Sequence, residues 1–165
     1  GDLCAWTDAG AGLPAAKVLG IELDPDLAAC ARANLRRLRD PDPRVSGAAE
    51  NGDLRDLVFP DDTAVLFADP GRRDAGGKRH ARSLDGATPP TEVLASLARR
   101  IGGRLVVKSA PAVREIGKLA AFDPEFRAVS LKGEMKEVAL YCGPLRRSAR
   151  SAVALPPGRS IETDG

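Results

Sequence analysis

The sequence predicts an α/β protein with a mostly parallel sheet, helices on both faces and an antiparallel hairpin at its C-terminal end. Two observations predict this class. Apolar, β-branched runs alternate along the chain with segments whose apolar residues recur at helical spacing. Later, Lys132-Gly133 separates two strand-like runs with no helix between them, which is the pattern of a hairpin. Strands that alternate with helices are typically parallel, because each helix returns the chain to the start of the next strand.

In the first half, a short apolar piece at 3–6 and a strand at 17–23 are expected. Asp24 and Pro25 then favour the start of a helix, because Asp caps free N–H groups and Pro suits the first turn. A weaker strand is expected at 45–49. One face of the predicted helix carries apolar residues at helical spacing, namely Leu27, Ala31, Leu35 and Leu38.

The second half continues the alternation up to the hairpin. Its expected strands are 63–68 and 104–110, its helices 88–101 and 112–121, and its hairpin strands 126–131 and 134–143. Gly102-Gly103 marks the end of the longer helix. We expect a core at residues 1–145, truncated at its N-terminus, followed by a polar tail at 146–165.

The composition is that of an ordinary globular domain. The chain has 165 residues, of which 43% are hydrophobic and 29% charged. A net charge of +2 does not by itself indicate nucleic acid. The three cysteines show neither zinc spacing nor a disulfide framework, which favours a reducing, cytoplasmic compartment. No apolar run approaches the length of a membrane span, so a membrane is not an expected partner. Because the cysteines lack zinc spacing, a metal is not expected either.

Three predicted strands end in residues that could carry chemistry. In parallel sheets, ligands bind at the carboxyl ends of the strands. Glu22, after the second strand, could accept both hydroxyls of a ribose, or be an ordinary exposed acid. Asp53 could accept from an exocyclic amine such as adenine N6, or simply close the turn in "NGD".

Asp69-Pro70 follows the strand "VLFA". The carboxylate and the fixed peptide carbonyl could together accept hydrogen bonds from an –NH2 group and orient its lone pair. The alternative is a turn that ends the strand. A basic run follows, which could pair with phosphates of RNA or could be a solvated loop. Its candidate residues are Arg72, Arg73, Lys78 and Arg79.

Two further residues need an explanation. Lys108 lies inside an apolar strand, so its charge must be paired or reach the end of the sheet. Residues 134–137, which hold Glu134, Lys136 and Glu137, are its candidate neighbours, and a structural role is as favoured as a catalytic one. His80 is the only histidine, and nothing near it in the sequence completes a triad.

Together these stretches resemble bacterial S-adenosylmethionine-dependent methyltransferases, in particular the family with a THUMP-like domain after the catalytic core. The similar stretches are "VLGIELDPDLAACARANL", "NGDLRDL", "VLFADPGRR", "RLVVKSAPAV" and "VSLKGEMKEVALYCGPL". The resemblance implies a Rossmann-like methyltransferase three-layer sandwich with a seven-stranded sheet. It also implies S-adenosylmethionine as cofactor and a nucleobase nitrogen in RNA as the methyl acceptor.

The resemblance also implies roles for individual residues. Asp69 and Pro70 would be the catalytic pair, at the place of an Asp/Asn-Pro-Pro motif. Glu22 would hold the ribose and Asp53 the adenine. The implied cofactor-binding set is Asp2, Cys4, Gly10, Gly12, Glu22, Leu23, Asp53, Leu54 and Asp69.

The first loop departs from the family pattern. Its glycine positions are occupied by Cys4, Trp6 and Asp8, while Gly10 and Gly12 come later. An alternative reading is therefore a catalytically inactive methyltransferase-like module that binds RNA or a protein partner. The conformation of residues 4–12 beside Glu22 discriminates the two. A nicotinamide-dependent oxidoreductase ranks lower, because no G-x-G-x-x-G follows the first strand.

Overall fold

The computed structural model describes residues 16–37, 45–60, 62–71, 82–84, 86–156 and 158–164. The chain forms two compact units, Gly1–Phe59 and Pro60–Gly165. Each unit is described by itself.

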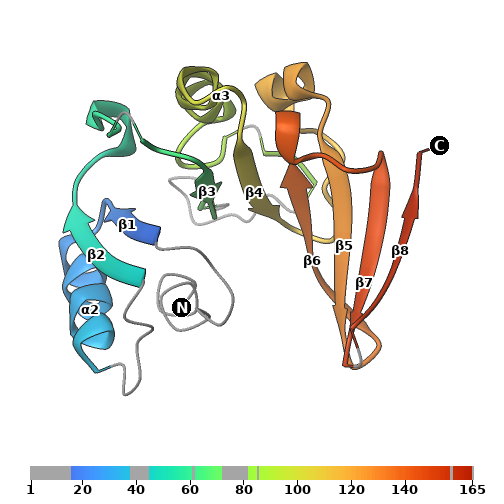
Figure 1. Cartoon of the computed structure of the whole chain (residues 1–165), viewed down its shortest axis with the longest axis horizontal. Helices are drawn as coiled ribbons and strands as arrows, with labels where there is room; N and C mark the ends of the chain where they lie inside the picture. Colours follow the sequence, from blue (N-terminus) through green and yellow to red (C-terminus); the bar gives the residue numbers. More distant parts are fainter. Residues whose placement is uncertain are drawn as a thin grey trace. The chain divides into compact units, whose positions relative to one another are not determined.

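The first unit contains a β-α-β arrangement (Figure 1). Strands β1 (Ala16–Glu22) and β2 (Val45–Asn51) pair in parallel, and helix α2 (Pro25–Arg36) connects them. The Asp24 carboxylate caps α2 as predicted, accepting hydrogen bonds from the amides of Asp26 (2.8 Å) and Leu27 (3.1 Å).

The buried face of α2 differs from the predicted one. Ala28 is fully buried, whereas Leu27 is 57% exposed. A short 3₁₀ helix, Leu54–Asp56, follows β2.

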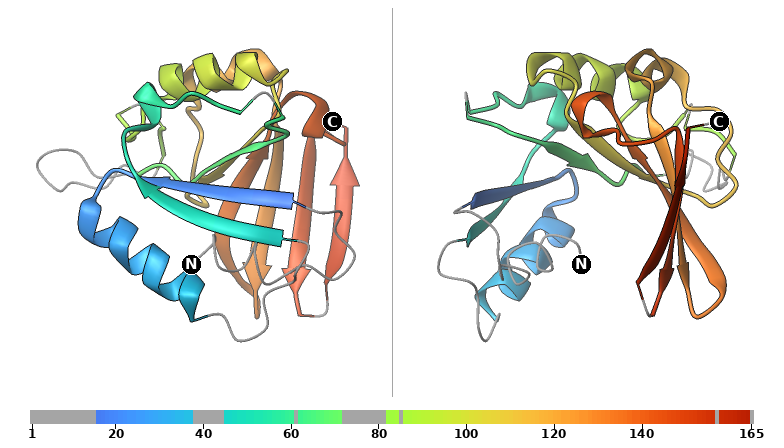
Figure 2. Two further views of the ribbon diagram at one scale, coloured as in Figure 1. Left: turned by 60° about the vertical axis from the view of Figure 1, so that its left-hand side comes forward. Right: turned by 45° about the vertical axis from the view of Figure 1, so that its right-hand side comes forward.

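The second unit is built on one six-stranded sheet, in the order β3-β4-β6-β5-β7-β8. Figure 1 shows this order across the sheet, and Figure 2 shows β5 to β8 as neighbouring strands of one twisted surface. The strands are β3 (Leu66–Ala68), β4 (Leu105–Ser109), β5 (Glu125–Leu131), β6 (Glu134–Tyr141), β7 (Arg150–Leu155) and β8 (Arg159–Thr163). Helix α3 (Thr91–Arg100) connects β3 to β4, which lie parallel.

The hairpin forms where the sequence predicts it. Lys132 and Gly133 both have positive φ, 52° and 83°, as a two-residue hairpin turn requires. Strand β6 lies between β4 and β5 and is antiparallel to both. The hairpin therefore belongs to the middle of this sheet.

The predicted Rossmann-like three-layer sandwich is wrong. In the described residues the strands fall into a two-stranded sheet and a six-stranded sheet, and three of the five pairs in the larger sheet are antiparallel. The fold is a mixed, mostly antiparallel sheet with a separate parallel pair. The expected first strand, at 3–6, lies outside the described residues.

Two local expectations differ from the structure for identifiable reasons. The helix expected at 112–121 is replaced by turns and a 3₁₀ helix, Gly117–Phe122, because Gly117 adopts a positive φ of 51° that an α-helix does not accommodate. The segment expected to be a polar tail at 146–165 instead contains β7 and β8, and β7 pairs in parallel with β5.

The core of the second unit lies around β4, β6 and α3. Its largest fully buried apolar side chains are Leu84, Leu94, Leu105, Leu119 and Leu140. Strand β8 is exposed along its whole length at the edge of the sheet.

Candidate functional site

The carboxyl ends of β1 and β2 are tied together by Asn51. Glu22 and Asn51 are partners in the parallel register. The Asn51 side-chain amide donates to the carbonyls of Glu22 (3.0 Å) and Leu23 (2.9 Å), and the Gly52 amide donates to the Glu22 carbonyl (3.0 Å). The turn after β2, which carries Asp53, is therefore fixed beside the turn after β1.

Glu22 ends β1 with a partly exposed carboxylate. Its Oε1 accepts a hydrogen bond from the Asp24 amide at 3.0 Å, which orients the group. In the described part of the chain, no donor is bonded to Oε2. A carboxylate oxygen that is oriented and available in this way suits the hydroxyls of a sugar.

Asp53 is held by its neighbour Arg55. The Asp53 carboxylate caps the 3₁₀ helix by accepting from the Arg55 amide at 2.8 Å. Arg55 Nε donates to both carboxylate oxygens at 2.9 Å, and Nη2 forms a further ion pair. These hydrogen bonds lower the pKa of Asp53 from 3.8 to about 2. A ligand amine would have to share or displace Arg55.

Replacing Arg55 with Gln is expected to raise the pKa of Asp53 from about 2 toward its usual value of 3.8, because the charged donor is lost. Carboxyl carbon chemical shifts followed by NMR during a pH titration measure this directly. The matched variant Arg32→Gln, in α2, should leave the pKa of Asp53 unchanged. A pKa still near 2 in Arg55→Gln would show that another group sets it.

The end of β3 presents Asp69 and Pro70. Pro70 is buried, and no residue in the described ranges donates a hydrogen bond to its carbonyl. Gly71 then pairs with Thr88 through two backbone hydrogen bonds of 2.8 and 2.9 Å. This pairing fixes the backbone directly after Pro70, and β3 fixes it directly before Asp69.

Lys108 is the cation between two acids at this strand end. Its Nζ lies 3.4 Å from Asp69 Oδ2 and 3.7 Å from Glu137 Oε2. The turn after β3 and the strands β4 and β6 thus contribute to one cluster. The Lys108 side chain is only 23% exposed, so these acids compensate a largely buried charge. The sequence predicted Glu137 among the partners and did not predict Asp69.

Ser109 is the second unusual group here. Its hydroxyl is buried, and it has no hydrogen-bond partner among the residues that the structure describes. Ala68 and Val107 are register partners, so Pro70 and Ser109 each lie two residues further along adjacent strands. An unsatisfied buried hydroxyl typically costs about 1–3 kcal/mol, so such groups are uncommon in folded proteins.

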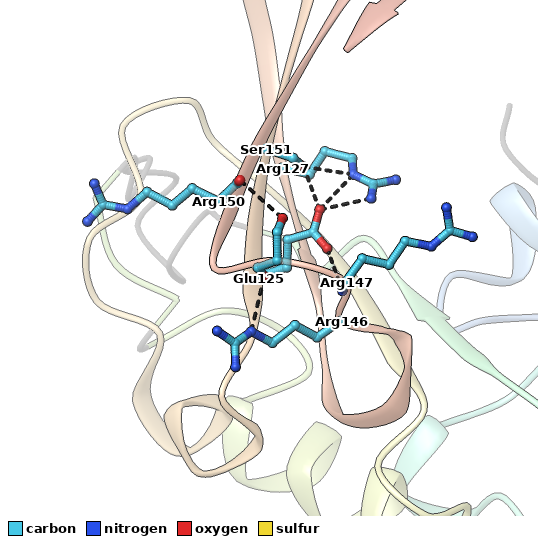
Figure 3. A network of polar contacts seen from close by, with 7 residues as sticks. Glu125, Arg127, Arg146, Arg147, Arg150 and Ser151 are labelled. Atoms are coloured by element: carbon cyan, nitrogen blue, oxygen red, sulfur yellow. Dashed lines mark hydrogen bonds and ion pairs between the residues drawn. The ribbon is translucent and has the colours of Figure 1, made fainter. Parts of the chain in front are cut away.

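A further polar network lies at the other end of the same sheet, around Glu125 (Figure 3). The carboxylate is fully buried at the start of β5. Its Oε1 accepts from Arg127 Nη2 (2.8 Å), Arg127 Nε (3.0 Å) and the Ser151 hydroxyl, and Oε2 accepts from the Arg147 amide (3.0 Å). Arg127 also stacks 4.3 Å above the Tyr141 ring. Burial raises the pKa of Glu125, but these hydrogen bonds outweigh it and hold the pKa below its usual value.

The structure brings some predicted site residues together and leaves others undescribed. Glu22, Leu23, Asp53 and Leu54 gather at the β1–β2 end, and Asp69 with Pro70 lies at the β3–β4 end. The remaining predicted residues lie outside the described ranges, namely Asp2, Cys4, Gly10, Gly12, Arg72, Arg73, Lys78 and Arg79.

Sequence reasoning missed Asn51, Arg55, Ser109 and the Glu125 network. The spacing of Glu125 and Arg127 within one strand was an available signal, because residues two apart share a face.

No described helix is long and apolar enough to cross a membrane. Within the described ranges, no group of three or more His, Cys, Asp or Glu side chains is arranged to hold a metal ion.

Comparison of the chain with known protein families, with curated proteins and with solved structures found no match.

Proposed function

We propose that this chain is the core of an S-adenosylmethionine-dependent methyltransferase that acts on a nitrogen of a nucleobase in RNA. The observation that carries the proposal is the turn after β3, where the Asp69 carboxylate pairs with Lys108 of β4 and the carbonyl of the buried Pro70 accepts no hydrogen bond from the described residues. Two acceptors on a rigid turn suit an –NH2 group, which has two protons to donate.

The residues at the end of β1 fit the cofactor's ribose. The Glu22 carboxylate is oriented by the Asp24 amide, and its other oxygen is available among the described residues. When bound, S-adenosylmethionine would supply a methyl group on a positively charged sulfur. Asp53 fits its proposed contact with adenine less well, because Arg55 already donates to both carboxylate oxygens.

In this proposal the protein acts mainly by positioning. Asp69 and the Pro70 carbonyl accept hydrogen bonds from the two N–H groups of the amine, which fixes the direction of the nitrogen lone pair. The bound cofactor, its ribose held by Glu22, would supply the methyl group, and its sulfur would keep the electron pair of the broken carbon–sulfur bond. The amine then releases one proton to water or to Asp69. Lys108, 3.4 Å from Asp69 Oδ2, holds the carboxylate in orientation.

Asp69→Ala is expected to reduce methyl transfer at least about 100-fold, because positioning contributes on this scale. The assay is incorporation of labelled methyl from S-adenosylmethionine into unmodified synthetic RNA. Asp69→Asn keeps one acceptor oxygen and should retain measurable activity.

Glu137→Gln is the control, because it removes the other acid beside Lys108 and leaves the acceptors in place. Equal losses in Asp69→Ala and Glu137→Gln would assign the cluster a structural role. Wild-type turnover in Asp69→Ala would refute the positioning role.

One observation favours the alternative of an inactive module that binds RNA or a partner. The Asp53 carboxylate is saturated by Arg55, which leaves it no free acceptor for adenine. A chain that binds RNA but neither S-adenosylmethionine nor S-adenosylhomocysteine would support this alternative.

A further inference from the structure

A group of arginines lies at the edge of the six-stranded sheet where β6 ends and β4, β5 and β7 begin. We call it the basic edge. Its members are Arg99, Arg100, Arg104, Arg146, Arg147 and Arg150. It is the end of the sheet opposite to the Asp69 turn, because Asp69 follows the C-terminus of β3 and β3 runs parallel to β4.

Backbone contacts join the turns that carry these arginines. The Cys142 amide donates to the Leu105 carbonyl at 2.9 Å. A Cβ placed on Gly143 would lie only 2.8 Å from the Gly103 carbonyl oxygen, so the α3–β4 and β6–β7 turns are in close contact. The basic edge is therefore one continuous surface within the second unit.

The buried carboxylate of Glu125 fixes the β6–β7 turn by a hydrogen bond to its backbone. Glu125 Oε2 accepts from the Arg147 backbone amide, and Arg146 Nε donates to the Ser148 carbonyl at 3.0 Å. Only the backbone of Arg147 is used in this way. Figure 3 shows the Arg147 and Arg150 side chains extending away from Glu125 in opposite directions. Both residues are exposed, and no described acid is paired with their guanidinium groups.

Neutral groups contact two other arginines of the basic edge. The Arg99 guanidinium lies 5.9 Å from the centre of the Phe122 ring, and Arg104 Nη1 donates to the Ile101 carbonyl at 3.3 Å. Such partners restrict the side chain without cancelling its charge, which lowers the entropy lost on binding an anion.

Acids at this edge offset the charge only in part. Asp123 is paired with Arg146, and Glu125 is buried and paired with Arg127. Glu162 and Asp164 lie near Arg150, whose register partner is Thr163. Arginines still outnumber acids along the edge.

We propose that the basic edge binds the phosphate backbone of a single-stranded nucleic acid. Guanidinium groups match phosphates in a bidentate geometry, and their spread over both sides of the edge suits a chain of repeated anions. The partly exposed Tyr141 ring, beneath Arg127, adds an aromatic surface beside the arginines. This inference does not depend on methyl transfer, because it concerns the sheet end away from Asp69.

The test is fluorescence anisotropy of a labelled 12-nucleotide RNA and the matching DNA, at about 50 and 200 mM salt. The double variant Arg147→Gln/Arg150→Gln removes two charges that the fold does not use. It should weaken binding about tenfold and lower the slope of log K against log salt by about 1.4, since single strands contribute about 0.7 per phosphate contact.

The matched control is Lys132→Gln/Arg159→Gln, which removes two exposed charges at the other end of the same sheet. It should change the affinity less than twofold. Equal weakening by both double variants would show a general charge effect and overturn the proposal. So would no binding by the wild-type chain, or displacement of the RNA by polyglutamate of equal charge. Thermal melts establish that each variant is folded.

Discussion

Replacing Glu125 with Ala is expected to lower the free energy of unfolding of the second unit by about 3 kcal/mol, because it removes one partner of a buried ion pair. The change leaves the Arg127 charge, the Ser151 hydroxyl and the Arg147 amide without their shared acceptor. A cavity adds to the loss, because Glu125 is fully buried. Urea denaturation monitored by circular dichroism measures the effect.

Glu134→Ala is the matched control. Glu134 sits on β6, its side chain is 75% exposed, and it pairs with Lys136. Surface pairs contribute about 0–1 kcal/mol, so little change is expected. If Glu125→Ala and Glu134→Ala cost the same, the buried network does not stabilise the sheet.

The same carboxylate predicts acid sensitivity. Because the pKa of Glu125 is lower in the folded state than its usual 4.5, the unfolded chain binds the proton more readily. The stabilisation that the ionised Glu125 carboxylate contributes is complete at pH values above 4.5. It is lost as the pH falls from 4.5 toward the pKa of Glu125 in the folded state. Glu125→Gln should therefore flatten this part of the stability profile.

Gly143→Ala is expected to destabilise the second unit by about 2–4 kcal/mol, through backbone strain together with a clash. Gly143 has a φ of 55°, and an added Cβ would lie 2.8 Å from the Gly103 carbonyl oxygen. That oxygen belongs to the backbone between α3 and β4, so it cannot move without shifting the strand. The melting temperature gives the readout.

Gly133→Ala separates strain from clash. Gly133 also has a positive φ, 83°, but nothing lies within 4 Å of the position of an added Cβ. Its substitution should cost only the conformational penalty, about 1 kcal/mol. Equal costs at positions 133 and 143 would contradict the close packing of the two turns.

Local signals predicted the start of α2 and the hairpin turn correctly, because such signals act over a few residues. Asp24-Pro25 marked the start of α2, and Lys132-Gly133 marked the hairpin turn, where positive φ is required. The cost of an unpaired charge in a strand predicted a partner for Lys108 within residues 134–137, and Glu137 is one of the two acids that the structure places there. These inferences needed no knowledge of which strands pair.

The sheet arrangement depended on long-range pairing, which local patterns do not encode. "RSAVAL" and "RSIET" are short and flanked by Arg, Pro and Gly, which is typical of a polar tail, yet they pair as β7 and β8. The Asp69–Lys108 ion pair likewise joins residues far apart in the chain. Arg55 was overlooked because an exposed Arg near a turn has no distinctive pattern.

The most direct test of the proposed function is calorimetric titration of the chain with S-adenosylmethionine and S-adenosylhomocysteine. Glu22→Gln removes the charge that would hold the ribose, and Glu50→Gln, on the neighbouring strand, is the matched control. We predict binding by the wild-type chain and by Glu50→Gln, and affinity at least about tenfold weaker in Glu22→Gln, as expected for a charged hydrogen bond. Absence of binding at millimolar cofactor, or equal affinity in the two variants, would contradict the account.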